Sequence, residues 1–487
     1  MRRYEGAIIV LVCITIIYSF TNSSFFLNAQ AGWTEDRRLT YFFGYSYDPR
    51  AACNGDTVHL VWWEHYGVSG NLREEVFYKR STDAGETWGE DVLLSVEDAQ
   101  TSALPQVSVA GHAVHVVWFE DDYGLLYRRS IDGGETWGAI DSIVPGGVHS
   151  SICAVGDTIY VCGVTGATGD LLFKRSVNGG NNWQSLQTIA AAHDSPTLRN
   201  ISNNVLSIVI SYEYTPEIYN VRSLDGGETW FDSQLVSEGI ASGSQMPAMD
   251  TNDSTDIHIT WYDYEYSPYP WTGDIFYRSS RDSGTTWEEI DSLTVMHRAV
   301  ASDILAENNN LHLVWEDDRN GFNDNFEIYY RMSTDLGQSW GVEQRLTDAV
   351  NWSRRPALAC DGQYLHLFWF DLRDDPSNIV GEIYYKRKDL SSGIVTGRES
   401  LMVLGSKIDV FPNPFTTVVR LQITDDRYEG LASIRLYDVS GKEVMVYEVT
   451  DRAKQIIFDT KDLPCGVYFL ALEAASCSGL MKVIKVE

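Results

Sequence analysis

The sequence predicts an all-β protein built mainly from repeats of one four-stranded sheet, and three observations support this. The 487 residues include 39 Gly, 15 Trp and 27 Tyr with only 22% charged residues, a composition typical of β proteins and unlike that of disordered chains. Short β-branched and aromatic runs recur between turn-forming residues, as strands do. A turn motif of eight residues, Ser-x-Asp-x-Gly-x-Thr-Trp, follows pairs of these runs. Repetition at regular spacing indicates an array of similar units.

Two strand patterns recur in a fixed order before the turn motif. The first is an apolar run that ends in Trp and an acid, as in residues 58–64, and the second is an aromatic and basic run, as in residues 76–80. Each copy of the first pattern is followed by the second, so seven pairs of middle strands are predicted. The other copies of the first pattern lie at 114–120, 257–263, 311–317 and 365–371, with weaker copies at 159–165 and 206–212.

The turn motif itself occurs six times, and we interpret it as structural. An Asp early in a tight turn accepts hydrogen bonds from backbone N–H groups two or three residues further on, Gly supplies a positive φ, and Trp offers apolar surface between neighbouring sheets. The seventh place, residues 388–393, is degenerate and lacks Trp. The residues at the Asp position are Asp83, Asp132, Asn178, Asp225, Asp282 and Asp335.

The motif resembles the Asp box, also called the BNR repeat, of sialidases and other β-propellers, and with its strands it covers residues 33 to about 397. The resemblance implies that each repeat is one blade of a ring, since four strands are the content of a propeller blade. Seven strand pairs predict seven blades, with six, the number in sialidases, as the alternative. Residues 33–40 copy the outer-strand pattern of residues 340–347 without a blade in front of them. We expect this N-terminal strand to complete blade seven and close the ring.

Residues 1–31 have the features of a secretory signal peptide. Arg2 and Arg3 precede an apolar run at residues 7–17, and a small-x-small cleavage site follows at residues 29–31. The apolar run is too short for a stable membrane anchor, and no membrane span is expected in the mature chain. The expected division of the mature chain is a propeller at 32–397, a polar linker at 398–408 and a C-terminal domain at 409–487.

The C-terminal region carries four motifs of its own. It opens with Pro-Asn-Pro at 412–414 and continues with Tyr-Asp-x-x-Gly-Lys at 437–442, Leu-x-x-Gly-x-Tyr at 463–468 and Lys-x-Ile-Lys at 482–485. Together they resemble a type IX secretion sorting domain of type A. The resemblance implies that the type IX machinery is a partner and that the protein is displayed on the cell surface or released. A small β-sandwich is the expected fold, and an immunoglobulin-like accessory module is the alternative.

Charge and cysteine spacing exclude several classes of partner. A net charge of −31 argues against binding to nucleic acid or to an anionic membrane, because nothing would neutralise phosphates. The cysteines match no zinc pattern, and no cofactor is expected. Acid-rich stretches at 317–325 and 371–375 could hold calcium, although neither matches a defined calcium loop. Cys53 and Cys360 occupy equivalent repeat positions, either as a disulfide or as two buried thiols.

Ligand binding is expected on the face that carries the loops between blades and between second and third strands, opposite the Asp boxes. There the sequence breaks the repeat in three ways: an aromatic run in blade five, a Trp-x-Asp-x-Arg motif in blades six and seven, and arginines near the start of inner strands. The candidate ligand-binding residues are Arg50, Tyr264, Tyr269, Trp271, Arg298, Asp317, Arg319, Arg355, Asp371 and Arg373.

Two functions are compatible with these features. The first is an exported propeller that binds a glycan or a cell-surface protein. The second is a sialidase-like glycoside hydrolase, whose family clamps a carboxylate with three arginines. The motif that carries the first of those arginines is absent, since the nearest stretch, residues 47–50, does not match, and no catalytic residue can be assigned. We therefore favour binding; convergence of Arg50, Arg298 and Arg355 in one pocket would instead favour the hydrolase.

Overall fold

A computed structural model describes the chain from residue 32 to residue 485, apart from short gaps. The described residues form two compact units, Trp33–Ser391 and a second unit within Ser392–Glu487, and each is considered by itself. The expected signal peptide at 1–31 and the aromatic residues Tyr269 and Trp271 lie outside the described residues. The internal gaps are 42–43, 69–70, 99, 167, 191–193, 203, 212–216, 239–242, 253–254, 265–272, 295–297, 320–324, 375–379, 391–398, 404–405, 412–417, 424–432, 439–441, 449–454, 462, 465 and 475–476.

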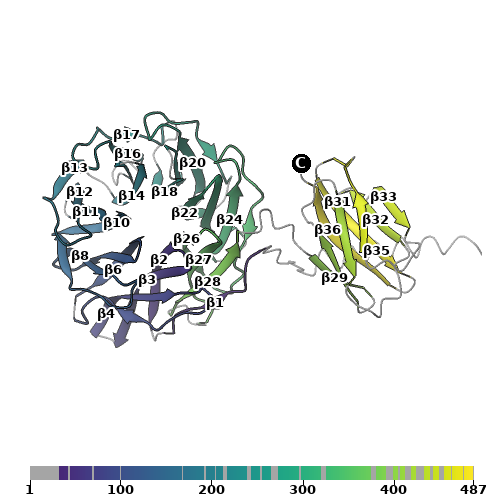
Figure 1. Ribbon diagram of the computed structural model, residues 1–487, viewed down its shortest axis with the longest axis horizontal. Coiled ribbons are helices and arrows are strands. Elements are labelled where there is room, and N and C mark those ends of the chain that lie inside the picture. The colour runs from purple at the N-terminus through teal and green to yellow at the C-terminus, as the bar shows by residue number, and fades with distance from the viewer. Residues whose placement is uncertain are drawn as a thin grey trace, which may run out of the picture. The chain divides into compact units, whose positions relative to one another are not determined.

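The first unit is a ring of seven four-stranded antiparallel sheets, which confirms the seven-bladed propeller over the six-bladed alternative (Figure 1). The inner strands are β2 (Tyr45–Asn54), β6 (Ser102–Ala110), β10 (Gly147–Val155), β14 (Asp194–Ser202), β18 (Ser244–Thr251), β22 (Ala299–Glu307) and β26 (Ser353–Cys360). The second strands are β3 (Thr57–Val68), β7 (Ala113–Glu120), β11 (Thr158–Thr165), β15 (Val205–Ser211), β19 (Ile257–Asp263), β23 (Asn310–Asp317) and β27 (Tyr364–Asp371).

The outer half of each blade is shorter and follows the same order. The third strands are β4 (Asn71–Ser81), β8 (Gly124–Ser130), β12 (Leu171–Ser176), β16 (Ile218–Ser223), β20 (Asp274–Ser280), β24 (Glu327–Ser333) and β28 (Glu382–Asp389). The outer strands are β5 (Val92–Leu93), β9 (Asp141–Val144), β13 (Gln187–Ala190), β17 (Gln234–Leu235), β21 (Asp291–Ser292), β25 (Gln344–Arg345) and, for blade seven, β1 (Arg37–Arg38).

The N-terminal strand β1 closes the ring by pairing with β28, as the sequence predicted. Its side chains repeat the contacts of the outer strand in blade six. The Thr40 hydroxyl donates to the Glu382 carboxylate at 2.6 Å, just as the Thr347 hydroxyl donates to Glu327 at 2.5 Å. Both carboxylates are fully buried, so each hydrogen bond satisfies a group that would otherwise be costly to bury. Closure therefore reuses the chemistry of an ordinary blade.

Trp33 replaces the tryptophan that the degenerate seventh motif has lost. Its ring meets Tyr330 of blade six edge-on, with centroids 5.4 Å apart. The Asp-box residue Trp137 meets Tyr78 of the preceding blade in the same way, at 4.9 Å. Edge-to-face packing of this kind adds to the gain from burying the rings. Both ends of the propeller sequence thus contribute to one blade.

The Asp-box turns share one hydrogen-bond pattern. In the first, Asp83 accepts the backbone N–H of Thr87 at 2.8 Å and its hydroxyl at 2.6 Å, while the Ser81 hydroxyl accepts the N–H of Gly85 at 2.8 Å. The N–H four residues beyond the Asp donates to it, and the N–H three residues beyond also lowers the pKa of the carboxyl group, as Thr229 and Glu228 do for Asp225. The N–H two residues beyond, on Gly85, donates to Ser81 instead. The same Oδ1 contact recurs at Asp132, Asn178, Asp225, Asp282 and Asp335.

Close contact between blades explains the glycine of the motif. A Cβ atom on Gly134 would lie 1.9 Å from the hydroxyl oxygen of Tyr78 in the preceding blade, and the residue has a φ of 84°. Tyr78 is held by a hydrogen bond of 2.8 Å to Nδ1 of His59. Burial lowers the pKa of His59 to about 4, so the ring is neutral at physiological pH. The repeated histidines therefore position the tyrosines on which the next turn packs.

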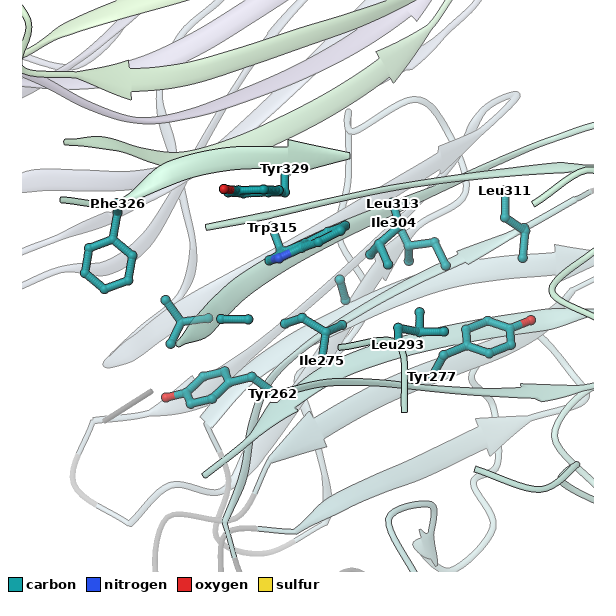
Figure 2. Packing of buried hydrophobic residues seen from close by; sticks show 13 residues of the cluster. Tyr262, Ile275, Tyr277, Leu293, Ile304, Leu311, Leu313, Trp315, Phe326 and Tyr329 are labelled. Atoms are coloured by element: carbon teal, nitrogen blue, oxygen red, sulfur yellow. The ribbon is translucent and has the colours of Figure 1, made fainter. Parts of the chain in front are cut away.

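The core consists of apolar clusters between adjacent blades. Figure 2 shows the cluster between blades five and six, where Trp315 and Tyr329 stack with ring centroids 5.8 Å apart above Ile275. The second-strand tryptophan at this position is fully buried in five blades, and burial of such large rings is a main source of stability. These residues are Trp62, Trp118, Trp261, Trp315 and Trp369.

The second unit contains two four-stranded antiparallel sheets, the strand content expected of a small β-sandwich. How their faces pack stays a prediction. The described part of the whole chain contains no helix, and so none that could span a membrane. The first sheet is β29 (Glu399–Val403), β30 (Ser406–Phe411), β31 (Val418–Ile423) and β34 (Gln455–Asp459). The second is β33 (Glu443–Glu448), β32 (Ser433–Asp438), β35 (Gly466–Ala474) and β36 (Cys477–Lys485).

Candidate functional site

The inner strands of all seven blades line a central cavity of about 500 Å³. Each inner strand shifts register near its start, as between Tyr47 and Arg50, and the shift places one non-glycine residue at a φ of 44° to 55°. Such bulges redirect side chains, and a positive φ strains a residue that has a Cβ atom. The seven residues, all of which line the cavity, are Asp48, Leu104, His149, Ser195, Met246, Ala301 and Arg355.

Charged side chains enter the cavity from several blades. Arg50 forms an ion pair of 3.2 Å with Asp48, and Arg199 forms one of 3.0 Å with Asp250. Asp303 accepts the backbone N–H of the neighbouring blade at Leu358, and burial raises the pKa of its carboxyl group. The cavity is therefore polar and holds charges of both signs.

Arg355 lies at the bulge of blade seven, and other groups hold its backbone and Nε. Its backbone N–H donates to Glu316 at 2.7 Å, and Nε donates to the Tyr47 hydroxyl at 3.2 Å. Burial acts to lower the pKa of Arg355, but Asp48, Tyr47 and Glu316 together outweigh it, so the pKa is raised and the side chain stays charged. The terminal nitrogens make no hydrogen bond to a described residue, which leaves them for a ligand.

The structure does not bring the three expected arginines together. Arg50 and Arg355 both line the cavity, whereas Arg298 lies outside the lining and forms an ion pair of 2.9 Å with buried Asp318. The third arginine in the lining is Arg199, which sequence reasoning missed. A basic residue within the inner strand of blade four, where most other blades have small or apolar residues, was the available signal.

The Trp-x-Asp-x-Arg motifs brace blades six and seven. The Arg319 guanidinium binds Asp317 at 2.5 Å and lies over the Tyr329 ring at 4.4 Å, and Arg373 binds Asp371 at 2.6 Å in the same manner. Each arginine also binds an acid of its own blade's outer segment, and neither lines the cavity. These outer acids are Glu343 and Asp36. The motif residues thus have a structural use in the described chain.

Only part of the aromatic run of blade five can be placed. Tyr264 is half-buried against the core cluster between blades five and six. Tyr262 is buried and donates to Gln245 at 2.8 Å, and burial raises its pKa to about 12. Tyr269 and Trp271 lie outside the described residues, so their role in binding stays a prediction.

Neither a metal site nor a disulfide is found in the part of the chain that is described. No group of three or more His, Cys, Asp or Glu side chains there could hold a metal ion. The carboxylates of Asp317 and Asp371 are occupied by arginine and indole donors. Residues 320–324 and 375 of the two acid-rich stretches lie outside the described residues, so calcium binding there stays a prediction. Cys53 and Cys360 are free thiols, and burial raises the pKa of Cys360 to about 12.

Comparison with known proteins identifies the C-terminal domain and the fold. Residues 409–486 match the family described as "Secretion system C-terminal sorting domain". No curated protein matches the sequence. Among solved structures, the BP39L lectin from Burkholderia pseudomallei is 11% identical with a TM-score of 0.53, over 70% of this chain and 96% of the lectin. At that identity the likeness shows the fold alone.

Two enzymes are also similar in structure. A PL25 ulvan lyase is 9% identical with a TM-score of 0.49, over 71% of this chain and 95% of the lyase. The NanB sialidase from Streptococcus pneumoniae is 11% identical with a TM-score of 0.42, over 73% of this chain and 70% of the sialidase. A propeller fold does not by itself separate binding from catalysis. The chain contains a seven-bladed β-propeller and, at residues 409–486, a type IX secretion sorting domain, and it is exported to the cell surface or released.

Proposed function

We propose that the propeller binds a glycan or protein ligand at the mouth of the central cavity, on the face opposite the Asp boxes. The main observation behind this proposal is the ring of seven bulge residues. Their backbone conformation is the same in every blade, but their side chains differ. A residue type that is repeated in every blade serves the blade, whereas a ligand site must break the repeat. The cavity volume of about 500 Å³ is in the range of ligand pockets.

The distribution of charge across the mouth supports recognition of a polar ligand. Blades seven and one contribute Arg355, Asp48 and Arg50, and blade four, across the ring, contributes Ser195, Thr197 and Arg199. A ligand would thus meet polar and charged groups from both sides of the cavity. Export to the surface gives this face access to extracellular glycans and proteins.

The test is a glycan array probed with the mature chain, with Arg355→Ala as the site variant. Because the terminal nitrogens of Arg355 have no hydrogen bond to a described residue, the variant should lose about tenfold or more in affinity with little change in melting temperature. Ile131→Ser is the matched control, since Ile131 is 73% exposed on the Asp-box face. Equal loss in both variants would contradict a site at the cavity mouth.

Glycoside hydrolysis is the second candidate, and the lining favours it less. Two of the three expected arginines line the cavity, but two of its carboxylates, Asp250 and Asp303, accept backbone N–H groups of the next blade. A panel of fluorogenic glycosides decides the matter. Turnover that Asp303→Asn abolishes, in a variant that still folds, would replace the binding proposal with a hydrolase.

A further inference from the structure

Trp352, in the loop before β26, has a relative exposure of 37%, the highest of any tryptophan in the described part of the chain. Most other tryptophans of the propeller pack in the clusters between blades. Keeping a large aromatic ring in contact with water forgoes the gain from burying it. Trp352 lies three positions before the cavity residue Arg355, so its exposed ring offers a ligand at the cavity mouth an apolar surface.

Neighbouring groups hold Trp352 in place. The Arg354 guanidinium lies over the Trp352 ring at 5.3 Å and over the Phe326 ring at 4.4 Å. Nε of Arg354 donates to Glu316 at 2.6 Å, and Glu316 is fully buried. The Trp352 carbonyl accepts the N–H of Leu372 at 2.9 Å. The indole is thus ordered before any ligand arrives, and binding would lose little side-chain entropy.

The shelf formed by Trp352, Arg354 and Phe326 adjoins the cavity mouth. Glu316 accepts both Nε of Arg354, at 2.6 Å, and the backbone N–H of Arg355, at 2.7 Å. One buried carboxylate therefore fixes the shelf and the cavity arginine together. Arg355 is three positions after Trp352, so their Cα atoms lie at most about 10 Å apart along an extended chain.

We propose that Trp352 is a stacking subsite for one pyranose ring of an oligosaccharide, whose next sugar places its hydroxyl groups on the terminal nitrogens of Arg355. This rests on the proposed function and narrows its ligand to a glycan chain. The C–H face of a pyranose packs on an aromatic ring, and sugar hydroxyls accept hydrogen bonds from guanidinium. A stable protein partner would cover about 800 Å² of this face, whereas the features seen here are one indole and a polar cavity, a scale that fits a chain of sugars.

The inference is tested by titrating the mature chain with malto-, cello-, laminari- and chito-oligosaccharides of one to six sugars, with indole fluorescence as the readout. Affinity should rise from the monosaccharide to the oligosaccharide in at least one series, with a change in fluorescence. Trp352→Ala should weaken that binding about tenfold. Trp352→Phe keeps an aromatic ring and should retain most of the affinity. If Trp352→Ala folds poorly, Trp352→Phe is the variant to compare with the wild type.

Phe231→Ala is the matched control. Phe231 is 48% exposed and lies under the Arg222 guanidinium at 4.9 Å, but just after an Asp box and far from the cavity lining. It should bind as the wild type does. Binding that survives in Trp352→Ala but is lost in Arg355→Ala would overturn the stacking subsite and leave the proposed function intact. A wild-type chain that binds no glycan on the array or in the titrations would overturn this inference. The proposed function would then rest on a protein ligand whose binding is lost in the Arg355→Ala variant.

Discussion

The Asp-box turn and the inner-strand bulge both recur around the ring, but they repeat in opposite ways. In the turn, the side chains recur together with their contacts, such as Gly134 against Tyr78 and Gly180 against Tyr127. In the bulge, the backbone recurs at nearly the same φ while the side chain changes from Asp48 to Ala301. Where the side-chain contacts are repeated, the residues join one blade to the next. Where only the backbone is repeated and the side chains vary, the residues can form a ligand-binding surface.

The largest effect should come from a Cβ atom in an Asp-box turn. Gly134→Ala should cost about 4 kcal/mol in free energy of unfolding, because it combines a positive φ with overlap on Tyr78. Gly111→Ala in the same blade has a similar φ but no atom within 4 Å of the new Cβ, and should cost about 1 kcal/mol. Urea denaturation measures both. Similar losses would show that φ alone matters and that the close contact between blades does not.

Closure by the N-terminal strand should be as costly to disturb as an ordinary blade contact. Trp33→Ala should lower the free energy of unfolding by about 3 kcal/mol, because a buried ring leaves Tyr330 uncovered. Trp137→Ala removes the equivalent contact with Tyr78 inside the ring and should cost about the same. Thermal and urea unfolding check both. A much smaller loss for Trp33→Ala would mean that the ring stays stable with blade seven incomplete.

A buried carboxyl group packed beside an inner strand and a carboxyl group in an Asp-box turn should respond to pH in opposite directions. Burial raises the pKa of Glu64 from 4.5 to about 8, although hydrogen bonds from Ser46 and Trp62 oppose it. Hydrogen bonds from Thr229 lower the pKa of Asp225 from 3.8 to about 2. Glu64 therefore contributes stability that is full below pH 4.5 and lost as the pH rises to 8. Asp225 contributes stability that is present above pH 3.8 and lost as the pH falls to 2.

Melting temperatures from pH 2 to pH 9 test this contrast. Glu64→Gln should remove part of the alkaline loss, on the order of 2 kcal/mol at pH 9, and Asp225→Asn part of the acid loss. A Glu64→Gln variant with the same alkaline profile as the wild type would show that Glu64 is ionised in the folded chain at neutral pH.

The smallest effect is expected at a bulge. Ala301→Gly relieves a positive φ of 44° but frees the unfolded chain, so the free energy of unfolding should change by less than about 1 kcal/mol. Urea denaturation beside Gly134→Ala gives the direct comparison. A loss of several kcal/mol would mean that the side chain at the bulge supports the scaffold, and the argument for a variable ligand surface would fail there.

The fold could be predicted largely because its signals are local. Turn chemistry at Asp83 and its copies, the apolar runs before each turn, and the outer-strand copy at 33–40 depend on neighbours in the chain. The site could be predicted only in part. Arg50 and Arg355 line one cavity and Arg298 does not, and whether any of them binds a ligand stays a prediction.

The sequence by itself determined the strand order, the number of blades, the closing strand and the sorting domain, since repeats and short motifs carry them. Only the tertiary structure decided which side chains face the cavity. A bulge shifts the register of each inner strand, and a shift of one residue moves a side chain to the other face. Arg199, beyond the bulge of β14, therefore enters the cavity, and Arg298, before the bulge of β22, binds Asp318. The exposed Trp352 was also decided by packing, because contacts with Arg354 and Leu372 fix its position.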